Sequence, residues 1–362
     1  MARTDKAKYL QIFDALQRAI RDGRYPQGVA LPSDGALVRR YGVSRITVTK
    51  AKDELVRRGL VYRRRGSGTF VTSSAGRESG RLGLILPSLS FGEIFPSICQ
   101  SLMRCAQADG YTFLLGDISA ATPKARAIQA CAVARSFVEQ RVAGVILQPL
   151  AFLRRPERAT QEILALFESA RIPVVLIDRD IELKEERIRH DYVGIDNIAA
   201  GRALGVHLLE QGAKRVGFLM RPNCATVIRE RLVGVRSARI EKPLDVKVIV
   251  ADPSKLDAFQ PWIKAKARPD SVVCESDYVA MLLRNTLQKL GLRVPEDVRL
   301  AGFDDVRYAA NMLPPLTTVR QPCADLAKIA YRTLRERIAD ADLPPRRILL
   351  PAPLVIREST RH

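Results

Sequence analysis

The sequence predicts an α/β protein with two parts: an N-terminal winged helix-turn-helix and a larger body built as a two-lobed pair of doubly wound parallel sheets. Residues 1–72 combine amphipathic helical patterns with a Gly-rich hairpin. From residue 81 on, short continuous apolar runs alternate with helical stretches, which is typical of parallel strands covered on both faces. A chain of 362 residues with 47% hydrophobic residues can fill two or three compact units.

The charge of the chain is strongly basic and unevenly distributed. It has 59 Lys and Arg against 39 Asp and Glu, a net charge of +20, and residues 1–72 hold 16 of the basic but only 6 of the acidic residues. This excess favours a polyanionic partner, although a basic surface that only faces solvent is the simpler alternative. No apolar run reaches the roughly 18–20 residues of a membrane span, and no apolar signal core follows Met1. We therefore expect a cytoplasmic protein without a membrane partner.

Cysteine and histidine usage predicts neither a metal site nor a disulfide framework. The six cysteines form no CxxC pair, and the three histidines are widely scattered, so we expect buried reduced thiols and no metal. The glycine-rich nucleotide-binding motifs and the nucleophile motif G-x-S-x-G are absent from the sequence. We accordingly expect no cofactor and no catalytic residues.

The N-terminal helices follow from apolar spacing and capping residues. An apolar stripe with helical spacing covers residues 6–21, and Ser33 is placed to cap a second helix. After a turn centred on Gly42, Ser44 is placed to cap a third helix. Its expected outward face carries basic and hydroxyl side chains: Arg45, Thr47, Thr49, Lys50 and Lys52. Two helices joined by a tight Gly turn, the second with such a face, predict a helix-turn-helix that binds double-stranded DNA.

A hairpin with a cationic tip follows the third helix. Residues 59–62 and 69–71 read as its strands, and the tip between them holds three consecutive arginines followed by Gly66. Such a tip can contact phosphates or the minor groove. The candidate DNA contacts of the whole segment are Ser33, Ser44, Arg45, Thr47, Thr49, Lys50, Lys52, Arg64, Arg65 and Gly66.

Residues 9–71 resemble the DNA-binding domain of the GntR regulator family. The resemblance rests on the ordered text "LPS…YGVSR.TV..A…L…GL…G.GTFV". It implies base or phosphate contacts from Arg45, Thr47 and the hairpin around Gly66. Gly35 and Thr49 stand where the family often carries arginine, so the operator sequence does not transfer from the family.

A short polar segment, residues 73–80, separates the two parts and reads as a flexible linker. The alternative is a short hinge helix that becomes ordered on DNA. The body, residues 81–362, has nine runs that predict strands: 82–86, 112–115, 144–147, 173–177, 192–195, 216–219, 246–250, 271–274 and 298–302. Nine or more strands are many for one sheet, so two lobes are expected.

Polar residues stand where several of these strands end. They are Asp178 and Arg179, then Asp196 and Asn197, then Ser276 and Asp277, then Asp304 and Asp305. Ligands of such sheets bind beyond the carboxyl ends of the strands, and carboxylates with a guanidinium suit a polyhydroxylated ligand. Phe91 and Phe95 follow the first strand and can supply an apolar floor for a sugar ring. The alternatives are structural: Asp196 and Asp277 as helix caps, and Phe95 as a core residue.

Residues 82–358 resemble the effector-binding domain of the LacI family, which has the periplasmic-binding-protein-like fold. The matching text includes "IPVVLIDRD", "VGIDNIAAGRALGVHLLEQGAKRVGFL", "GLRVPEDVRLAGFDDV" and "PPLTTVRQP". The resemblance implies two lobes, about 81–194 with 322–345 and about 195–318 with 346–362. It also implies pocket residues Asp178, Arg231, Asp304 and Gln321. Ser276 replaces an asparagine that is common in the family, so a shorter hydroxyl stands where the family often has an amide that contacts the ligand.

These observations predict a ligand-responsive bacterial transcription regulator of the arabinose-repressor type. It is expected to be a homodimer that binds operator DNA and a sugar or sugar derivative, with effector relieving repression. A sugar-binding transport receptor is the alternative, disfavoured by the attached helix-turn-helix. An enzyme fused to the DNA-binding segment is a third possibility, but no motif supports it.

Overall fold

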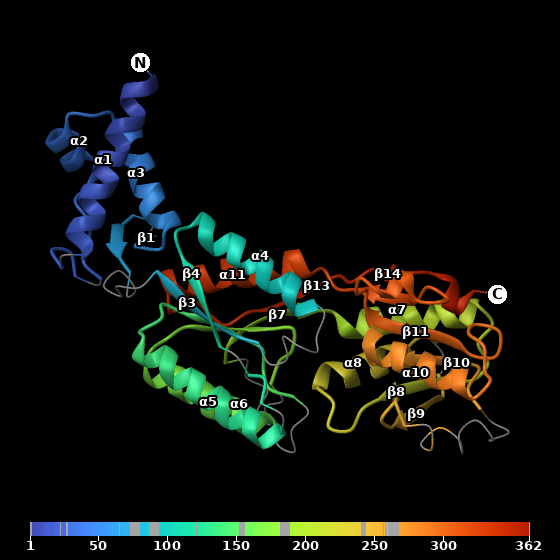
Figure 1. Cartoon of the computed structure of the whole chain (residues 1–362). Helices are drawn as coiled ribbons and strands as arrows, with labels where there is room; N and C mark the ends of the chain where they lie inside the picture. The colour runs from blue at the N-terminus through green and yellow to red at the C-terminus, as the bar shows by residue number, and fades with distance from the viewer. Residues whose placement is uncertain are drawn as a thin grey trace.

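The structure is a computed structural model in which a small head stands on one end of an elongated two-lobed body (Figure 1). Among the residues it describes, no helix is long and apolar enough to cross a membrane. The described residues are 2–21, 23–26, 28–64, 66–72, 80–86, 94–116, 118–120, 122–151, 156–181, 189–239, 244–255, 257, 259 and 268–361. The segment 73–79, which contains most of the expected linker, lies outside them, as do Arg65 and Phe91.

The head is a winged helix-turn-helix, as predicted. Ser33 accepts the N–H of Ala36 at 3.2 Å and Ser44 accepts the N–H of Thr47 at 3.3 Å, so both serines cap their helices. Gly42 takes a φ of +60° at the end of the second helix, a conformation that favours glycine. The elements are α1 (Ala2–Arg21), α2 (Asp34–Tyr41), α3 (Arg45–Arg57) and the wing strands β1 (Val61–Arg64) and β2 (Gly68–Val71).

Each lobe of the body holds one six-stranded sheet. The first sheet is entirely parallel, with the order β13-β7-β6-β5-β3-β4. Its strands are β3 (Arg81–Ile85), β4 (Thr112–Gly116), β5 (Val145–Leu147), β6 (Val174–Ile177), β7 (Asp191–Ile195) and β13 (Arg347–Leu350).

The second sheet has the order β14-β12-β11-β10-β8-β9 and is parallel except for β14, which runs antiparallel to β12. Its strands are β8 (Val216–Met220), β9 (Val246–Val250), β10 (Ser271–Cys274), β11 (Arg299–Asp304), β12 (Thr317–Arg320) and β14 (Leu354–Val355).

Helices cover both faces of each sheet, so alternate residues of a strand contribute to different cores. In the first lobe, α4 (Ile94–Ala108) and α11 (Cys323–Ala339) lie on one face, and α5 (Pro123–Glu139) and α6 (Pro156–Ser169) lie on the other (Figure 1). In the second lobe, α7 (Asn197–Glu210) and α8 (Thr226–Arg236) cover one face and α10 (Asp277–Lys289) covers the opposite face.

The chain crosses between the lobes after β7, after β12 and between β13 and β14. The expectation that residues 346–362 belong to the second lobe needs one correction. Strand β13 pairs with β7 of the first lobe, from Arg347 with Tyr192 to Leu350 with Ile195. The change of lobe therefore comes after Leu350, and only the residues beyond it join the second lobe.

Candidate effector cleft and DNA-binding face

A cavity of about 790 Å³ lies where the carboxyl ends of the two sheets face each other. Both lobes contribute to its wall. Its lining includes Ile94, Phe95, Arg126, Asp178, Arg179, Arg221, Arg231, Glu275, Ser276, Tyr278, Asp304, Val306 and Gln321. Its size is in the range of small-molecule sites in proteins.

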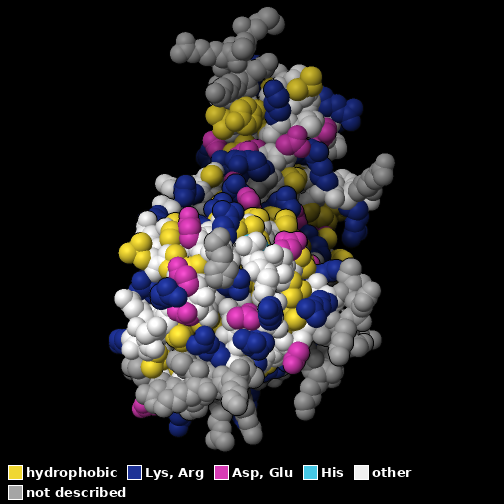
Figure 2. Space-filling model, turned by 90° about the vertical axis from the view of Figure 1, so that its right-hand side faces the viewer, with side chains coloured by type: hydrophobic (Ala, Val, Ile, Leu, Met, Phe, Trp, Pro, Cys, Tyr) yellow, Lys and Arg dark blue, Asp and Glu magenta, His cyan; other side chains and the backbone are white. Residues whose placement is uncertain are grey.

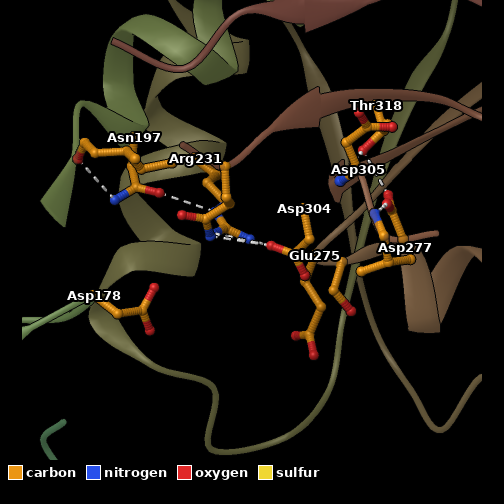
Figure 3. A network of polar contacts seen from close by, with 12 residues as sticks. Asp178, Asn197, Arg231, Glu275, Asp277, Asp304, Asp305 and Thr318 are labelled. Atoms are coloured by element: carbon orange, nitrogen blue, oxygen red, sulfur yellow. Dashed lines mark hydrogen bonds and ion pairs between the residues drawn. The ribbon is translucent and has the colours of Figure 1, made fainter. Parts of the chain in front are cut away.

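Arg231 on α8 is a buried cation of this cavity with several partners. Its Nε donates to Oδ1 of Asn197 at 3.0 Å, and its Nη1 donates to the carbonyl of Glu275 at 2.6 Å (Figure 3). The guanidinium also lies over the ring of Phe303 at 4.5 Å, and Nη2 is 3.9 Å from Oδ1 of Asp304. With only 4% of the residue exposed, its orientation is fixed before any ligand arrives.

Asp304 ends β11 and points its carboxylate at the same space. Its φ of +118° lies in a region that non-glycine residues rarely adopt, which is typical of functional positions. Burial raises the pKa of Asp304 to about 6, although Arg231 and the amide of Gln321 both favour the charged form. Gln321 donates from Nε2 to Oδ1 of Asp304 at 3.1 Å and lines the cavity beside it.

Asp178 supplies a carboxylate from the first lobe. It follows β6 with a φ of +69° and accepts a hydrogen bond from Nε2 of Gln148 at 2.7 Å. Arg179 donates to the same carboxylate at 3.4 Å. Figure 3 shows Asp178 on a separate element from Arg231 and Asp304. A ligand in the cavity would therefore meet hydrogen-bonding groups from both lobes.

Most of the effector residues expected from the sequence come together in this cavity. Phe95, Asp178, Arg179, Arg231, Ser276, Asp304 and Gln321 all line it, and Phe91 lies outside the described residues. Asp277 needs a correction, because it is fully buried and is not among the lining residues. Its carboxylate instead accepts from the N–H of Val306 at 3.0 Å and from the hydroxyl of Thr318 at 2.6 Å.

Sequence reasoning missed Glu275 and Arg221 of this site. Glu275 is fully buried and forms an ion pair with Arg221, and the two residues directly follow the neighbouring strands β10 and β8. Asn197, which the strand-end rule selected, orients Arg231 and does not itself line the cavity. Glu275 directly follows β10, so the same strand-end rule that selected Ser276 could have found it. Asp196 caps α7 through the N–H of Ala199 at 2.8 Å and lies outside this cavity, in agreement with the cap alternative.

The exposure of the side chains on α3 agrees only in part with the expected set of DNA contacts. Arg45 and Lys50 are exposed and Thr49 is half-buried. Thr47 is buried and shares a hydrogen bond with Ser44, 2.9 Å between the hydroxyl oxygens. Ile46, which the sequence reasoning did not select, is 69% exposed.

Lys52 also departs from the expectation that it faces DNA. Its ammonium is buried and donates to Oδ1 of Asp34 at 2.7 Å and to the carbonyl of Pro32 at 2.8 Å. Lys52 therefore ties α3 to α2 inside the head, and both Lys52 and Thr47 are removed from the set of DNA-facing side chains.

The wing extends the basic surface beside α3. Gly66 takes a φ of +76° at its tip, and the guanidinium of Arg64 lies 5.8 Å from the ring of Phe70. Arg63 forms an exposed ion pair with Asp53 of α3 at 2.7 Å, which links the wing to the recognition helix only weakly. Figure 2 shows Lys and Arg side chains on the head, at the top of the view, and spread over the body below.

Two family models match the chain. The model of bacterial regulatory proteins of the gntR family matches residues 8–71, and the model of the periplasmic binding protein-like domain matches residues 206–360. The HTH-type transcriptional repressor PurR of Shigella sonnei is 30% identical over 286 residues, which cover 77% of this chain and 79% of the relative. The chain belongs to the bacterial transcriptional regulators that join a GntR-type head to a LacI-type body. It is a regulator and not an enzyme.

One further relative matches the whole chain, and a solved structure matches its body. The arabinose metabolism transcriptional repressor of Geobacillus stearothermophilus is 25% identical over 369 residues, 98% of each chain. A crystal structure of a LacI family transcriptional regulator from Enterococcus faecalis V583 with bound ribose is 24% identical, with a TM-score of 0.64 over 78% of this chain and 98% of that one. This likeness to a solved structure shows the fold of the body.

Proposed function

We propose that this regulator binds operator DNA through its head and a sugar or sugar derivative in the cleft between its lobes, with effector relieving repression. The observation that carries the proposal is the convergence of Arg231, Asp304 and Asp178 on one cavity. Each carboxylate accepts from ligand hydroxyls and the guanidinium donates to them, while Phe95 offers an apolar surface to a sugar ring. The arabinose repressor and the ribose-bound regulator among the similar proteins support a sugar-like ligand.

The operator is bound by a homodimer in the cytoplasm, so two heads contact two half-sites about one helical turn apart, roughly 34–36 Å. The proposed DNA contacts are those of the expected set that remain exposed or half-buried: Ser33, Ser44, Arg45, Thr49, Lys50, Arg64 and Gly66. Arg45 at the start of the recognition helix is the expected base-reading residue, since N-terminal residues of such helices meet base edges.

A thermal-shift screen of the full chain tests the effector class. Sugars, sugar phosphates and nucleosides form the panel, and a ligand at 100 times its Kd stabilises by about 2.7 kcal/mol. We expect a sugar-like compound to raise the Tm, and both Arg231→Ala and Asp304→Asn to abolish the shift. Arg202→Ala is the matched control, because Arg202 is exposed on α7 outside the cleft. A shift that both cleft variants keep would place the ligand elsewhere.

A further inference from the structure

The head contacts the first lobe through the C-terminal end of the recognition helix. Nη1 of Arg57 donates to Oδ1 of Asp109 at 2.8 Å, and Nη2 of Arg335 donates to the carbonyl of Arg57 at 2.6 Å. The phenol of Tyr111 lies 3.5 Å from the carbonyl of Arg58, as a longer hydrogen bond. These contacts join residues 52 to 278 positions apart in the sequence.

The guanidinium of Arg335 is a favourable partner for the C-terminal end of α3. The last carbonyl groups of a helix lack partners within the helix and carry partial negative charge, so a cation there is favourable. Only 7% of Arg335 is exposed, and its guanidinium lies over the ring of Tyr111 at 4.3 Å. A Cβ added at Gly59 would lie 3.4 Å from Nη2 of Arg335, so the head backbone sits directly against this guanidinium.

Two helices run from the effector cleft to this contact. Helix α4 begins with Ile94 and Phe95, which line the cleft, and Asp109 follows its last residue. Helix α11 begins two residues after Gln321, which also lines the cleft, and carries Arg335 in its last two turns. At about 1.5 Å per residue, each spans roughly 22–25 Å.

The two helices pack against each other on the same face of the first-lobe sheet (Figure 1). The hydroxyl of Tyr331 on α11 donates to Oδ2 of Asp109 at 3.0 Å. Asp109 therefore binds α11 through one oxygen and the recognition helix through the other. The end of the helix pair and the end of α3 form one hydrogen-bonded unit.

We propose that Asp109 and Arg335 form a docking site that positions the recognition helix, and that the α4–α11 pair transmits the state of the cleft to the orientation of the head. The docked head is compatible with DNA binding, because Arg45 and Lys50 lie away from the docked end of α3 and stay exposed. The transmission part rests on the cleft proposed above as the effector site, whereas the docking part does not.

Hydrogen exchange of the full chain, followed by mass spectrometry, tests the docking. In Arg335→Ala and in Asp109→Asn we expect faster exchange in the segments around residues 57–60 and 109–111. Arg332→Ala is the matched control: it lies one turn earlier on α11, is 70% exposed in its side chain and pairs only with Glu336 among the described residues. Exchange that is unchanged in both docking variants would overturn the docking site.

Operator affinity gives the functional readout, with a DNA sequence selected from a random library as the probe. If undocking lowers the fraction of competent heads to a tenth, the apparent affinity falls about tenfold. We expect this loss in both docking variants and not in Arg332→Ala. Arg57→Ala combined with Asp109→Asn should cost less than the sum of the two single effects, because both remove the Arg57–Asp109 ion pair. Equal or tighter DNA binding by Arg335→Ala and Asp109→Asn would overturn the positioning role.

Transmission is tested without any effector, since coupling between two sites is reciprocal. Binding of the selected DNA to the wild-type chain should change hydrogen exchange in the first turns of α4 and α11, at the cleft. The same change should be lost in Arg335→Ala. If DNA leaves the cleft unaffected in the wild type, transmission fails while docking stands. Neither result depends on which ligand, if any, the thermal-shift screen finds.

Discussion

The hydroxyl of Thr318 donates to Oδ1 of Asp277 at 2.6 Å inside the second lobe. The second carboxylate oxygen of Asp277 accepts the N–H of Val306, so one side chain joins α10, β12 and the loop after β11. That loop directly follows Asp304, whose carboxylate faces the cleft. Asp277 therefore supports the cleft from behind and takes no direct part in binding.

Asp277→Ala should lower the stability of the chain. The hydroxyl of Thr318 and the N–H of Val306 would both lose their buried acceptor, at a cost of about 1–3 kcal/mol each. Urea denaturation measures the loss. Asp325→Ala is the control, because its carboxylate is 62% exposed and its pair with Lys328 contributes at most about 1 kcal/mol. Equal midpoints for the two variants would contradict the assigned role.

Asp304 should make stability depend on pH in the acid range. Its pKa is raised from 3.8 to about 6 in the folded chain, chiefly by burial. Between pH 3.8 and about 6, the folded state therefore binds more protons than the unfolded state. The stability that protonated Asp304 contributes is complete below the unfolded pKa and is lost as the pH rises through about 6. Asp304→Asn lacks this titration, so the wild type should lose stability relative to the variant over that interval. Urea denaturation at several pH values measures it; parallel curves would contradict the shift.

Lys50 and Lys52 should affect DNA binding in different ways, although they stand two residues apart. Lys50 is exposed, so Lys50→Ala should reduce the slope of log affinity against log salt by about 0.9 for the lost phosphate contact. Lys52→Ala should keep the slope but lower the stability of the head, because it breaks the buried pair with Asp34. Titrations at several salt concentrations distinguish the two. A reduced slope for Lys52→Ala would return Lys52 to the DNA-facing set.

Arg45 and Ile46 should read bases at neighbouring positions. Arg45→Ala should cost about 1–3 kcal/mol if Arg45 contacts a guanine, and an exposed Ile46 offers an apolar contact to a thymine methyl group. Selection from random DNA should show that Ile46→Ser loses a thymine preference at one position of each half-site. An unchanged selected sequence would exclude base contact by Ile46.

The nine strands predicted in the body are all present, within a residue or two of the expected bounds. Parallel strands buried on both faces have continuous apolar sequences, and such runs can be recognised locally. Strands β12, β13 and β14 were missed because they are short, flanked by prolines and, in β12, rich in threonine. Their strand conformation depends on pairing with sheets assembled from distant parts of the chain.

The cleft was predictable to a similar extent. The strand-end rule selected Asp178 and Asp304, whereas Arg231 and Gln321 came from the family resemblance. The rule does not say which of three consecutive side chains enters the cavity. Glu275 pairs with Arg221, Ser276 caps α10 and Asp277 turns inward. For Lys52, helical spacing predicted an outward side chain, but its ammonium is buried in an ion pair with Asp34 of α2.

The position of α11 and β13 in the chain has a consequence for synthesis on the ribosome. Both elements complete the first lobe, yet they follow almost all of the second lobe in the sequence. Until residues 323–350 have emerged, the apolar face of the first sheet that Leu326, Ala330 and Leu334 later cover has only α4 upon it. The head can fold first. The hydrophobic core of the first lobe is completed only after the second lobe has been synthesised, so this core stays incomplete in the nascent chain through most of translation.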